Sequence, residues 1–263
     1  MNKIISLEAA AAQVASESTL ALGGMTLYRR PMAFVRALLR RFRQTGEPNN
    51  LTLLTFTGSL ETDLLIGAGM VRRLRSCYCG FEAFGLAPMF TYYANHSEIE
   101  VMEETEGSLS MGLRAQMSGV GFMPGRGWLG TDLPRLRPDV KTVADPYSGE
   151  TLMAFPAIRP DVAVLHALDA DQEGNVVLGA NRGVDEELAL TSKVCIVTSE
   201  KISPLLEKAD LTAPVIPWVA LAEKGALPTS CHPYYPMDGE AIMSYLDQVS
   251  DPKSFAAFLQ QWL

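Results

Sequence analysis

The chain has 263 residues, of which 48% are hydrophobic and 20% are charged, and these values allow one large globular domain. Its formal net charge is −8 and no basic stripe runs along it, which argues against nucleic acid as a partner. No apolar run reaches the 18 residues that span a bilayer, and the first residues lack the order of a signal peptide, so we expect a cytoplasmic protein without membrane contact.

Hydrophobic periodicity predicts helices and strands that alternate along most of the chain. In chain order these are helix 7–14, strand 19–22, helix 31–42, strand 51–56, helix 60–68, strand 75–81, helix 87–96, strand 99–102, helix 108–118, strands 151–155, 161–168 and 176–178, helix 185–193, strand 194–198, and helices 239–249 and 254–262. The alternation predicts an α/β fold with an open, largely parallel sheet and flanking helices. We expect a single domain over residues 1–263, with a loop-rich elaboration at about 119–148.

The cysteines and histidines show no metal-binding spacing. Cys77 and Cys79 are separated by one residue within a predicted strand, so their side chains point to opposite faces. His96, His166 and His232 are scattered along the chain. We therefore expect no metal, and free thiols in a reducing compartment.

The first segment with chemical potential follows the first predicted strand. There Gly23, Gly24 and Met25 form a turn, and Arg29 and Arg30 precede the next helix. Glycines let main-chain N–H groups approach a ligand, and such groups can hold a thioester oxygen that becomes negative during acyl transfer. The two arginines can clamp a carboxylate or a phosphate. A plain tight turn with surface arginines explains the same residues.

The second segment places Glu106 where a strand gives way to a helix, with Arg126 in the loop-rich region that follows. A carboxylate near a helix N-terminus is stabilised by the helix dipole, which is a sufficient reason for Glu106. The functional interpretation makes Glu106 a base or a substrate-facing carboxylate and Arg126 a carboxylate binder. Both interpretations stay open.

The third segment carries His166 at the end of a strongly apolar strand. The simpler interpretation is a core histidine that is satisfied by main-chain groups. Asp169 and Asp171 come before Gly174 and Asn175, and side-chain bonds from the aspartates to the main chain would shape that turn.

In order and spacing, these segments resemble the family I CoA-transferases, specifically the α subunit of the glutaconate CoA-transferase group. Residues 161–175 resemble the family's DVA-x-x-HA…D-x-x-GN core, and residues 194–200 (VCIVTSE) resemble its vIVT-x-E strand. The glycine pair with the following Arg-Pro helix resembles the family's oxyanion and CoA-site loop. Residues 225–229 resemble its GAHPT stretch, with Leu227 where the family has histidine.

The resemblance implies an enzyme subunit that acts on a small acyl-CoA, a dicarboxylic one included, with coenzyme A entering as part of that substrate. It implies an αβ or α2β2 assembly in which a β-type subunit carries the catalytic glutamate and the active site lies at the interface. On this chain it implies oxyanion or CoA contacts from Gly23, Gly24 and Met25. The groups implied to hold the substrate's carboxylate or phosphate are Arg29, Arg30 and Arg126.

The reaction stays open between three relatives of one fold. Residues 106–126 are similar to a subgroup that contains ring-opening acyl-CoA hydrolases of steroid degradation, whose α subunit supplies a glutamate and an arginine at the places of Glu106 and Arg126. A decarboxylase of methylglutaconyl-CoA type is a further relative. We therefore weigh CoA transfer against hydrolysis and decarboxylation, and against a non-catalytic subunit that binds CoA esters.

Overall fold

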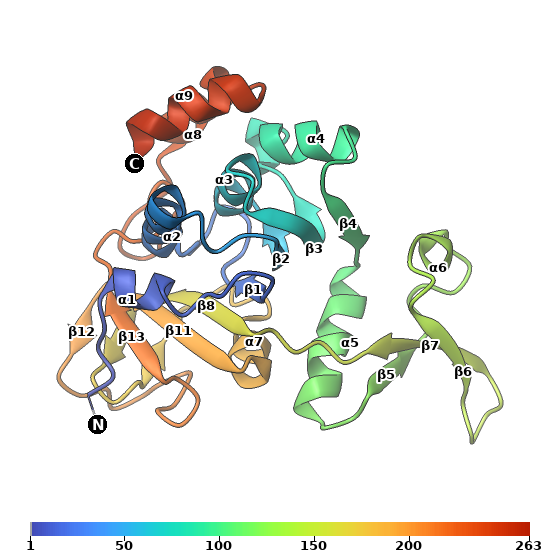
Figure 1. The fold of residues 1–263 in the computed structure, drawn as a ribbon. Coiled ribbons are helices and arrows are strands. Elements are labelled where there is room, and N and C mark those ends of the chain that lie inside the picture. The colour runs from blue at the N-terminus through green and yellow to red at the C-terminus, as the bar shows by residue number, and fades with distance from the viewer. Residues whose placement is uncertain (1) are drawn as a thin grey trace.

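The computed structural model describes residues 2–263 and is built around one seven-stranded sheet (Figure 1). Its strand order is β13-β11-β8-β1-β2-β3-β4, and every pairing is parallel. The strands are β1 (Thr19–Leu22), β2 (Leu51–Gly58), β3 (Val71–Cys79), β4 (Glu100–Glu103), β8 (Val162–Ala167), β11 (Val194–Ser199) and β13 (Trp218–Leu221). The predicted α/β fold with a largely parallel sheet is confirmed.

Helices cover both faces of this sheet. On one face lie α1 (Leu7–Ala11), α2 (Met32–Thr45), α3 (Leu60–Gly67), α4 (Pro88–Asn95), α8 (Gly239–Gln248) and α9 (Pro252–Trp262), with the short 3-10 helix η1 (Glu82–Phe84). On the other face lie α5 (Glu106–Met117) and α7 (Asp185–Thr191). None of the helices within residues 2–263 combines the length and the apolar content needed to cross a membrane.

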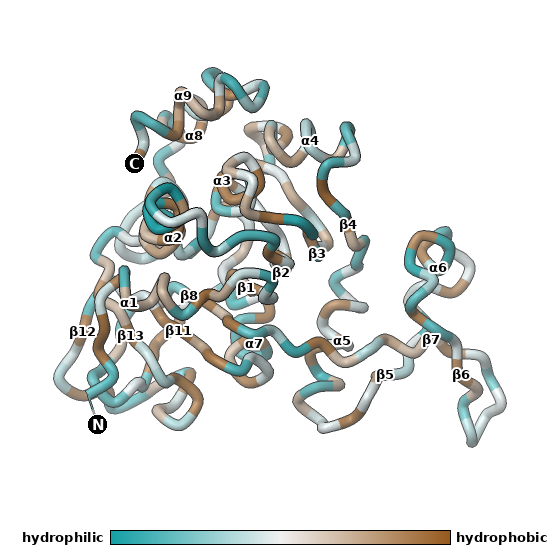
Figure 2. The backbone as a smooth tube through the Cα atoms, in the orientation of Figure 1, coloured by the Kyte–Doolittle hydropathy of each residue, from teal (hydrophilic) through white to brown (hydrophobic). Residues whose placement is uncertain are grey.

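The two-residue period of a strand divides the core into two clusters. Leu20 and Leu22 of β1 pack with the helices of the α2 face, whereas Ala21 between them packs with α5 and α7. Strand β8 is buried along its whole length, as a central parallel strand must be. Figure 2 shows the same pattern, with hydrophobic colour along the strands of the sheet and hydrophilic colour on the outer surface of α2.

Two small sheets complete the fold. The first has the order β10-β9-β12 and consists of β9 (Asp169–Asp171), β10 (Val176–Val177) and β12 (Ile202–Ser203). The second is antiparallel, has the order β5-β7-β6, and consists of β5 (Phe122–Gly125), β6 (Lys141–Ala144) and β7 (Thr151–Pro156), accompanied by α6 (Leu133–Leu136). It projects from the main sheet (Figure 1) and has its own small core around Trp128 and Phe155. Much of the expected loop-rich segment thus belongs to this sheet.

A buried carboxyl group joins three of the helices. Asp63 of α3 accepts hydrogen bonds from the main-chain N–H groups of Met89 (3.2 Å) and Phe90 (2.7 Å) in the first turn of α4. It also accepts one from the hydroxyl of Tyr245 in α8, at 2.5 Å. Burial raises the pKa of Asp63 to about 6, although these hydrogen bonds act in the opposite direction.

We expect this shift to make stability depend on pH. A carboxyl whose pKa rises on folding binds its proton more tightly in the folded state, so its contribution is present below 3.8 and is lost as the pH rises through about 6. Relative to Asp63→Asn, the wild-type free energy of unfolding should rise by roughly 2 kcal/mol between pH 7 and pH 4. Urea unfolding of both proteins across this range measures it, and a constant difference would contradict it.

Candidate functional site

The glycine loop after β1 uses its N–H groups within the chain. Gly23 donates to a carbonyl oxygen of β8 at 2.9 Å, and Gly24 donates to the Asp185 carboxylate at 2.8 Å. Met25 donates to the main-chain oxygen of Tyr28 at 2.9 Å. An oxyanion hole needs donors that are free to bind a developing negative charge. The expected oxyanion role of these three residues therefore does not fit the structure, which uses them to close a turn.

Close packing explains why the turn needs glycine. A Cβ added at Gly23 would lie 2.4 Å from Leu165 and 2.6 Å from an oxygen of Asp185. Gly24 has a φ of +82°, and a Cβ there would lie 2.5 Å from the main-chain oxygen of Arg29. Both positions exclude a side chain for reasons internal to the fold.

Arg29 and Arg30 are also internal. Both side chains are fully buried. Arg29 forms an ion pair with Asp185 at 2.8 Å and donates to the main-chain oxygen of His166 at 2.7 Å. Arg30 forms an ion pair with the equally buried Glu61. Because both guanidinium groups are already paired and lie away from solvent, the expected role in holding a substrate carboxylate or phosphate does not fit them.

His166 belongs to a buried network of side chains. Its Nδ1 lies 2.9 Å from the hydroxyl of Thr198, and its Nε2 lies 2.8 Å from a carboxylate oxygen of Glu200. Glu200 also accepts hydrogen bonds from the hydroxyl of Tyr235 and from two main-chain N–H groups of the loop after β13. The expectation of a core histidine satisfied by main-chain groups is corrected, because side chains satisfy both ring nitrogens.

The network favours a neutral imidazole beside a carboxylate. Burial lowers the pKa of His166, and the hydrogen bond with Glu200 only partly offsets this. Burial alone would raise the pKa of Glu200, but hydrogen bonds from His166 and Tyr235 bring it below its ordinary value. Cys231 offers its sulfur within 4.8 Å of ligand atoms of His166 and Glu200. Burial raises the pKa of this thiol to about 12.

Glu106, unlike the glycine loop, is exposed and has no partner within the described chain. It is the first residue of α5, follows the carboxyl end of β4, and is exposed. The helix end is capped by its neighbours, since Thr105 Oγ1 accepts from the Ser108 N–H at 3.1 Å and Ser108 Oγ accepts from the Thr105 N–H at 2.8 Å. Within residues 2–263 the Glu106 carboxylate forms no hydrogen bond or ion pair, so it remains free to act on a ligand.

A buried cluster holds this helix start in place. Glu104 accepts hydrogen bonds from Arg75 of β3 at 2.7 Å, from Arg137 at 2.9 Å and from the hydroxyl of Ser108 at 2.5 Å. The side chains of Glu104 and Arg137 are buried. The cluster joins β3, α5 and the projecting sheet region, so it fixes the place at which Glu106 emerges. Spacing along the sequence gives no signal for it.

Arg126 lies in the same neighbourhood but is not paired with Glu106. It follows β5, its side chain is 72% exposed, and it forms an ion pair with Glu150, which is 51% exposed. Two residues further on, the ring N–H of Trp128 donates to Thr105 Oγ1 at 3.2 Å, immediately beside Glu106. The structure thus brings the segment of Arg126 next to the start of α5. An exposed ion pair of this kind is weak and exchanges readily.

In open α/β sheets, ligands bind beyond the carboxyl ends of the strands, and the free carboxylate of Glu106 lies just after the carboxyl end of β4. The chain belongs to the Coenzyme A transferase family, whose model matches residues 4–223. It is thus one component of a CoA-transferase-family enzyme.

Two curated relatives match almost the whole chain. The A subunit of the 3-oxoadipate CoA-transferase of Pseudomonas knackmussii is 33% identical over 93% of this chain and 87% of its own length. The cholesterol ring-cleaving hydrolase IpdA subunit of Rhodococcus jostii is 31% identical over all of this chain and 92% of its own length. The family therefore includes both a transferase and a hydrolase at similar distances from this chain.

Solved structures agree with the fold. Glutaconate coenzyme A-transferase from Acidaminococcus fermentans superposes with a TM-score of 0.90 at 26% identity, covering 99% of this chain and 88% of that one. A variant of the decarboxylase AibA/AibB superposes with a TM-score of 0.87 at 28% identity, covering 99% of this chain and all of that one. The predicted resemblance to the α subunit of glutaconate CoA-transferase is confirmed.

Proposed function

We propose that this chain is the α subunit of a heteromeric enzyme that transfers coenzyme A to or from a small acyl group, a dicarboxylic one included. The observation that carries the proposal is the free, exposed carboxylate of Glu106 beyond the carboxyl end of β4, in a chain of this family. The start of α5 is held in place there by the hydrogen bond from Trp128 to Thr105. In this scheme the β-type partner supplies the glutamate that attacks the thioester, and acyl transfer proceeds in two easier steps.

Exposed apolar side chains mark the edge at which the partner would bind. They lie on segments before and after Glu106 in the chain, and β4, which precedes it, is an edge strand that pairs with β3 on one side only. Leu86 is 73% exposed, and Tyr78, Val101, Phe122 and Leu129 are exposed as well. Exposed apolar side chains of this kind are found at protein interfaces, and they support an αβ or α2β2 assembly with the site between the subunits.

Within this site we assign Glu106 a substrate-facing role and Arg126 the binding of a substrate carboxylate after release from Glu150. The glycine loop, with Gly23, Gly24 and Met25, and the internal pairs of Arg29 and Arg30 then shape the carboxyl edge without contacting the substrate. This assignment replaces the role of the arginines that the sequence led us to expect.

Hydrolysis of an acyl-CoA is the second candidate. It is favoured by the same free Glu106, because a carboxylate without a partner can act as a general base towards water, and by the similarity to the ring-cleaving hydrolase subunit. Decarboxylation is a third outcome on the same fold, as the similarity to the decarboxylase AibA/AibB indicates.

The complex with its β-type partner separates these reactions. It would be incubated with a panel of acyl-CoA thioesters, treated with borohydride, and examined by mass spectrometry. Transfer predicts that a glutamate of the partner is reduced to an alcohol, because borohydride reduces the thioester between this glutamate and CoA and releases CoA as the free thiol. A free acid without a reduced glutamate would support hydrolysis, and release of carbon dioxide would support decarboxylation; either result would overturn the transfer proposal.

We also expect the chain to be inactive on its own. The attacking glutamate is assigned to the partner, and the apolar edge around Leu86 is exposed without it. Turnover of acyl-CoA should appear only when both subunits are mixed, and it should saturate at equal stoichiometry. Turnover by the purified chain alone would contradict the assignment of the nucleophile to the partner.

A further inference from the structure

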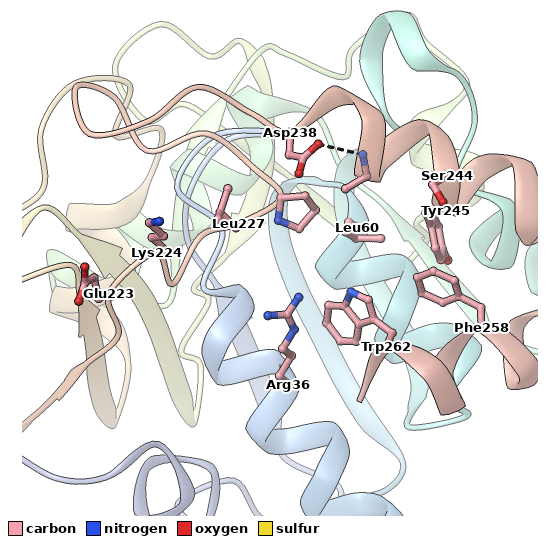
Figure 3. A pocket seen from close by; sticks show the side chains of 12 residues that line it. Arg36, Leu60, Glu223, Lys224, Leu227, Asp238, Ser244, Tyr245, Phe258 and Trp262 are labelled. Atoms are coloured by element: carbon pink, nitrogen blue, oxygen red, sulfur yellow. Dashed lines mark hydrogen bonds between the residues drawn. The ribbon is translucent and has the colours of Figure 1, made fainter.

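A pocket of about 480 Å³ lies on the α2 face of the sheet, whereas α5, which begins at Glu106, packs on the opposite face. Figure 3 shows it between α2, the α8–α9 pair and the loop that follows β13. Strand β13 and strand β4, which precedes Glu106, form the two opposite edges of the main sheet. Much of the pocket wall comes from residues beyond 223, where the match to the family model ends.

Arg36 of α2 is the distinctive group in this pocket. Its guanidinium lies over the ring of Trp262, with 4.2 Å to the ring centroid, and points into the space drawn in Figure 3. The Nε atom is buried without a hydrogen-bond partner, and the side chain has no ion pair within the described chain. Other arginines of α2 are engaged, since Arg40 donates to Leu263 at 3.3 Å and Arg41 donates to main-chain oxygens at 2.7 and 2.9 Å.

A half-buried cation without a counter-ion is unfavourable, because burial removes water from the charge. Burial lowers the pKa of Arg36, and the charge of nearby Arg40 lowers it further. An anion in the pocket would restore the lost interactions, and a guanidinium presents two parallel N–H groups to a carboxylate. The ring of Trp262 holds the guanidinium plane in position for such a contact.

The other lining groups restrict the kind of anion. Lys224 adds a second positive charge, while Glu223 and Asp238 contribute two carboxylates. Asp238 is occupied in part by capping α8, where it accepts from the Ala241 N–H at 2.9 Å. With carboxylates in the wall, a doubly charged phosphate meets more repulsion than a single carboxylate does. Leu60, Leu227 and Phe258 provide an apolar wall for the rest of the molecule.

We propose that this pocket binds a small monocarboxylate with an apolar body, whose carboxylate is held by Arg36 over Trp262. The apolar part lies against the side chains of Leu60, Leu227 and Phe258. The site is separate from the one at Glu106, so it does not depend on which acyl-CoA reaction the enzyme performs. The proposed ligand is a free short-chain carboxylic acid.

Hexanoate is a suitable probe, with inorganic phosphate as the competing anion. Calorimetric titration of the assembled enzyme should show saturable hexanoate binding, and Arg36→Met should weaken it at least tenfold, since a charge-assisted hydrogen bond is lost. Arg43→Met is the matched control, because Arg43 lies on the same helix but is exposed and outside the pocket. It should bind hexanoate like the wild type.

A second variant tests the pocket without touching the charge. Ala241→Phe places a ring in the cavity and should reduce hexanoate binding to a similar degree while Arg36 stays in place. Hexanoate binding should also change the tryptophan fluorescence, because Trp262 lines the pocket, and Trp262→Phe should abolish this change. Absence of saturable hexanoate binding, equal binding by Arg36→Met, or phosphate binding as tightly as hexanoate would each overturn the proposal. Binding that is lost in Arg36→Met and Ala241→Phe but kept in Arg43→Met supports it.

Discussion

Replacing Glu106 by glutamine in the assembled enzyme should lower kcat on its acyl-CoA substrate by about 100-fold or more, because the amide can neither accept a proton nor carry the charge. The free energy of unfolding should change by less than ~0.5 kcal/mol, since the side chain is exposed and the cap is formed by Thr105 and Ser108. Steady-state kinetics and thermal unfolding of the same preparation measure the two quantities.

Glu240→Gln is the matched control for the helix-dipole interpretation. Glu240 is also exposed and lies in the first turn of a helix, α8, with Asp238 as the cap, but it does not follow a strand of the main sheet. If Glu106 serves only the helix dipole, both substitutions should cost a few tenths of a kcal/mol and leave kcat unchanged. If Glu106→Gln has the same kcat as the wild type, Glu106 serves only to stabilise the helix dipole.

The main fold could be predicted because its strands are buried on both faces and its helices have one apolar face. Strand β8 shows this in its run of apolar residues, and the alternation with helices then favours a parallel sheet. Strand β13 (Trp218–Leu221) is absent from the predicted elements, because it is a four-residue edge strand in a segment rich in proline. Two strands of the projecting sheet are absent for a related reason, since β5 and β6 have four residues each and β5 contains Pro124 and Gly125.

The candidate site was predictable only in part. Glu106 stands out because it follows a strand at the start of a helix, and Arg126 is singled out through family resemblance. The pairing of Arg29 with Asp185 joins residues that are 156 positions apart, and no local pattern shows such a contact. A sequence shows that two arginines follow a glycine turn, but it does not show whether they face a ligand or the core.

Arg30 provides the sharpest test of this distinction. Its pair with Glu61 is fully buried, and the same guanidinium donates to Thr55 Oγ1 and to the Gly24 oxygen, each at 2.8 Å. Arg30→Met should lower the free energy of unfolding by ~3–5 kcal/mol, because it leaves the Glu61 carboxylate buried without a cation. The expected fall in Tm is roughly 10 °C for a chain of this size. A substrate-binding arginine would instead raise KM and leave Tm unchanged.

The double variant Arg30→Met/Glu61→Gln separates a lost ion pair from lost packing. Glutamine keeps an oxygen for the N–H of Ser59, which donates to Glu61 at 3.0 Å, but it carries no charge. We therefore expect the double variant to be more stable than Arg30→Met alone, since no unpaired charge remains buried. If the stability losses of the two single variants simply add in the double variant, the two side chains are not coupled, and the account of Arg30 as a buried structural cation would be wrong.

Arg126→Met is the control at an exposed ion pair. It should lower the free energy of unfolding by less than ~0.5 kcal/mol, because the ion pair of Arg126 with Glu150 is exposed.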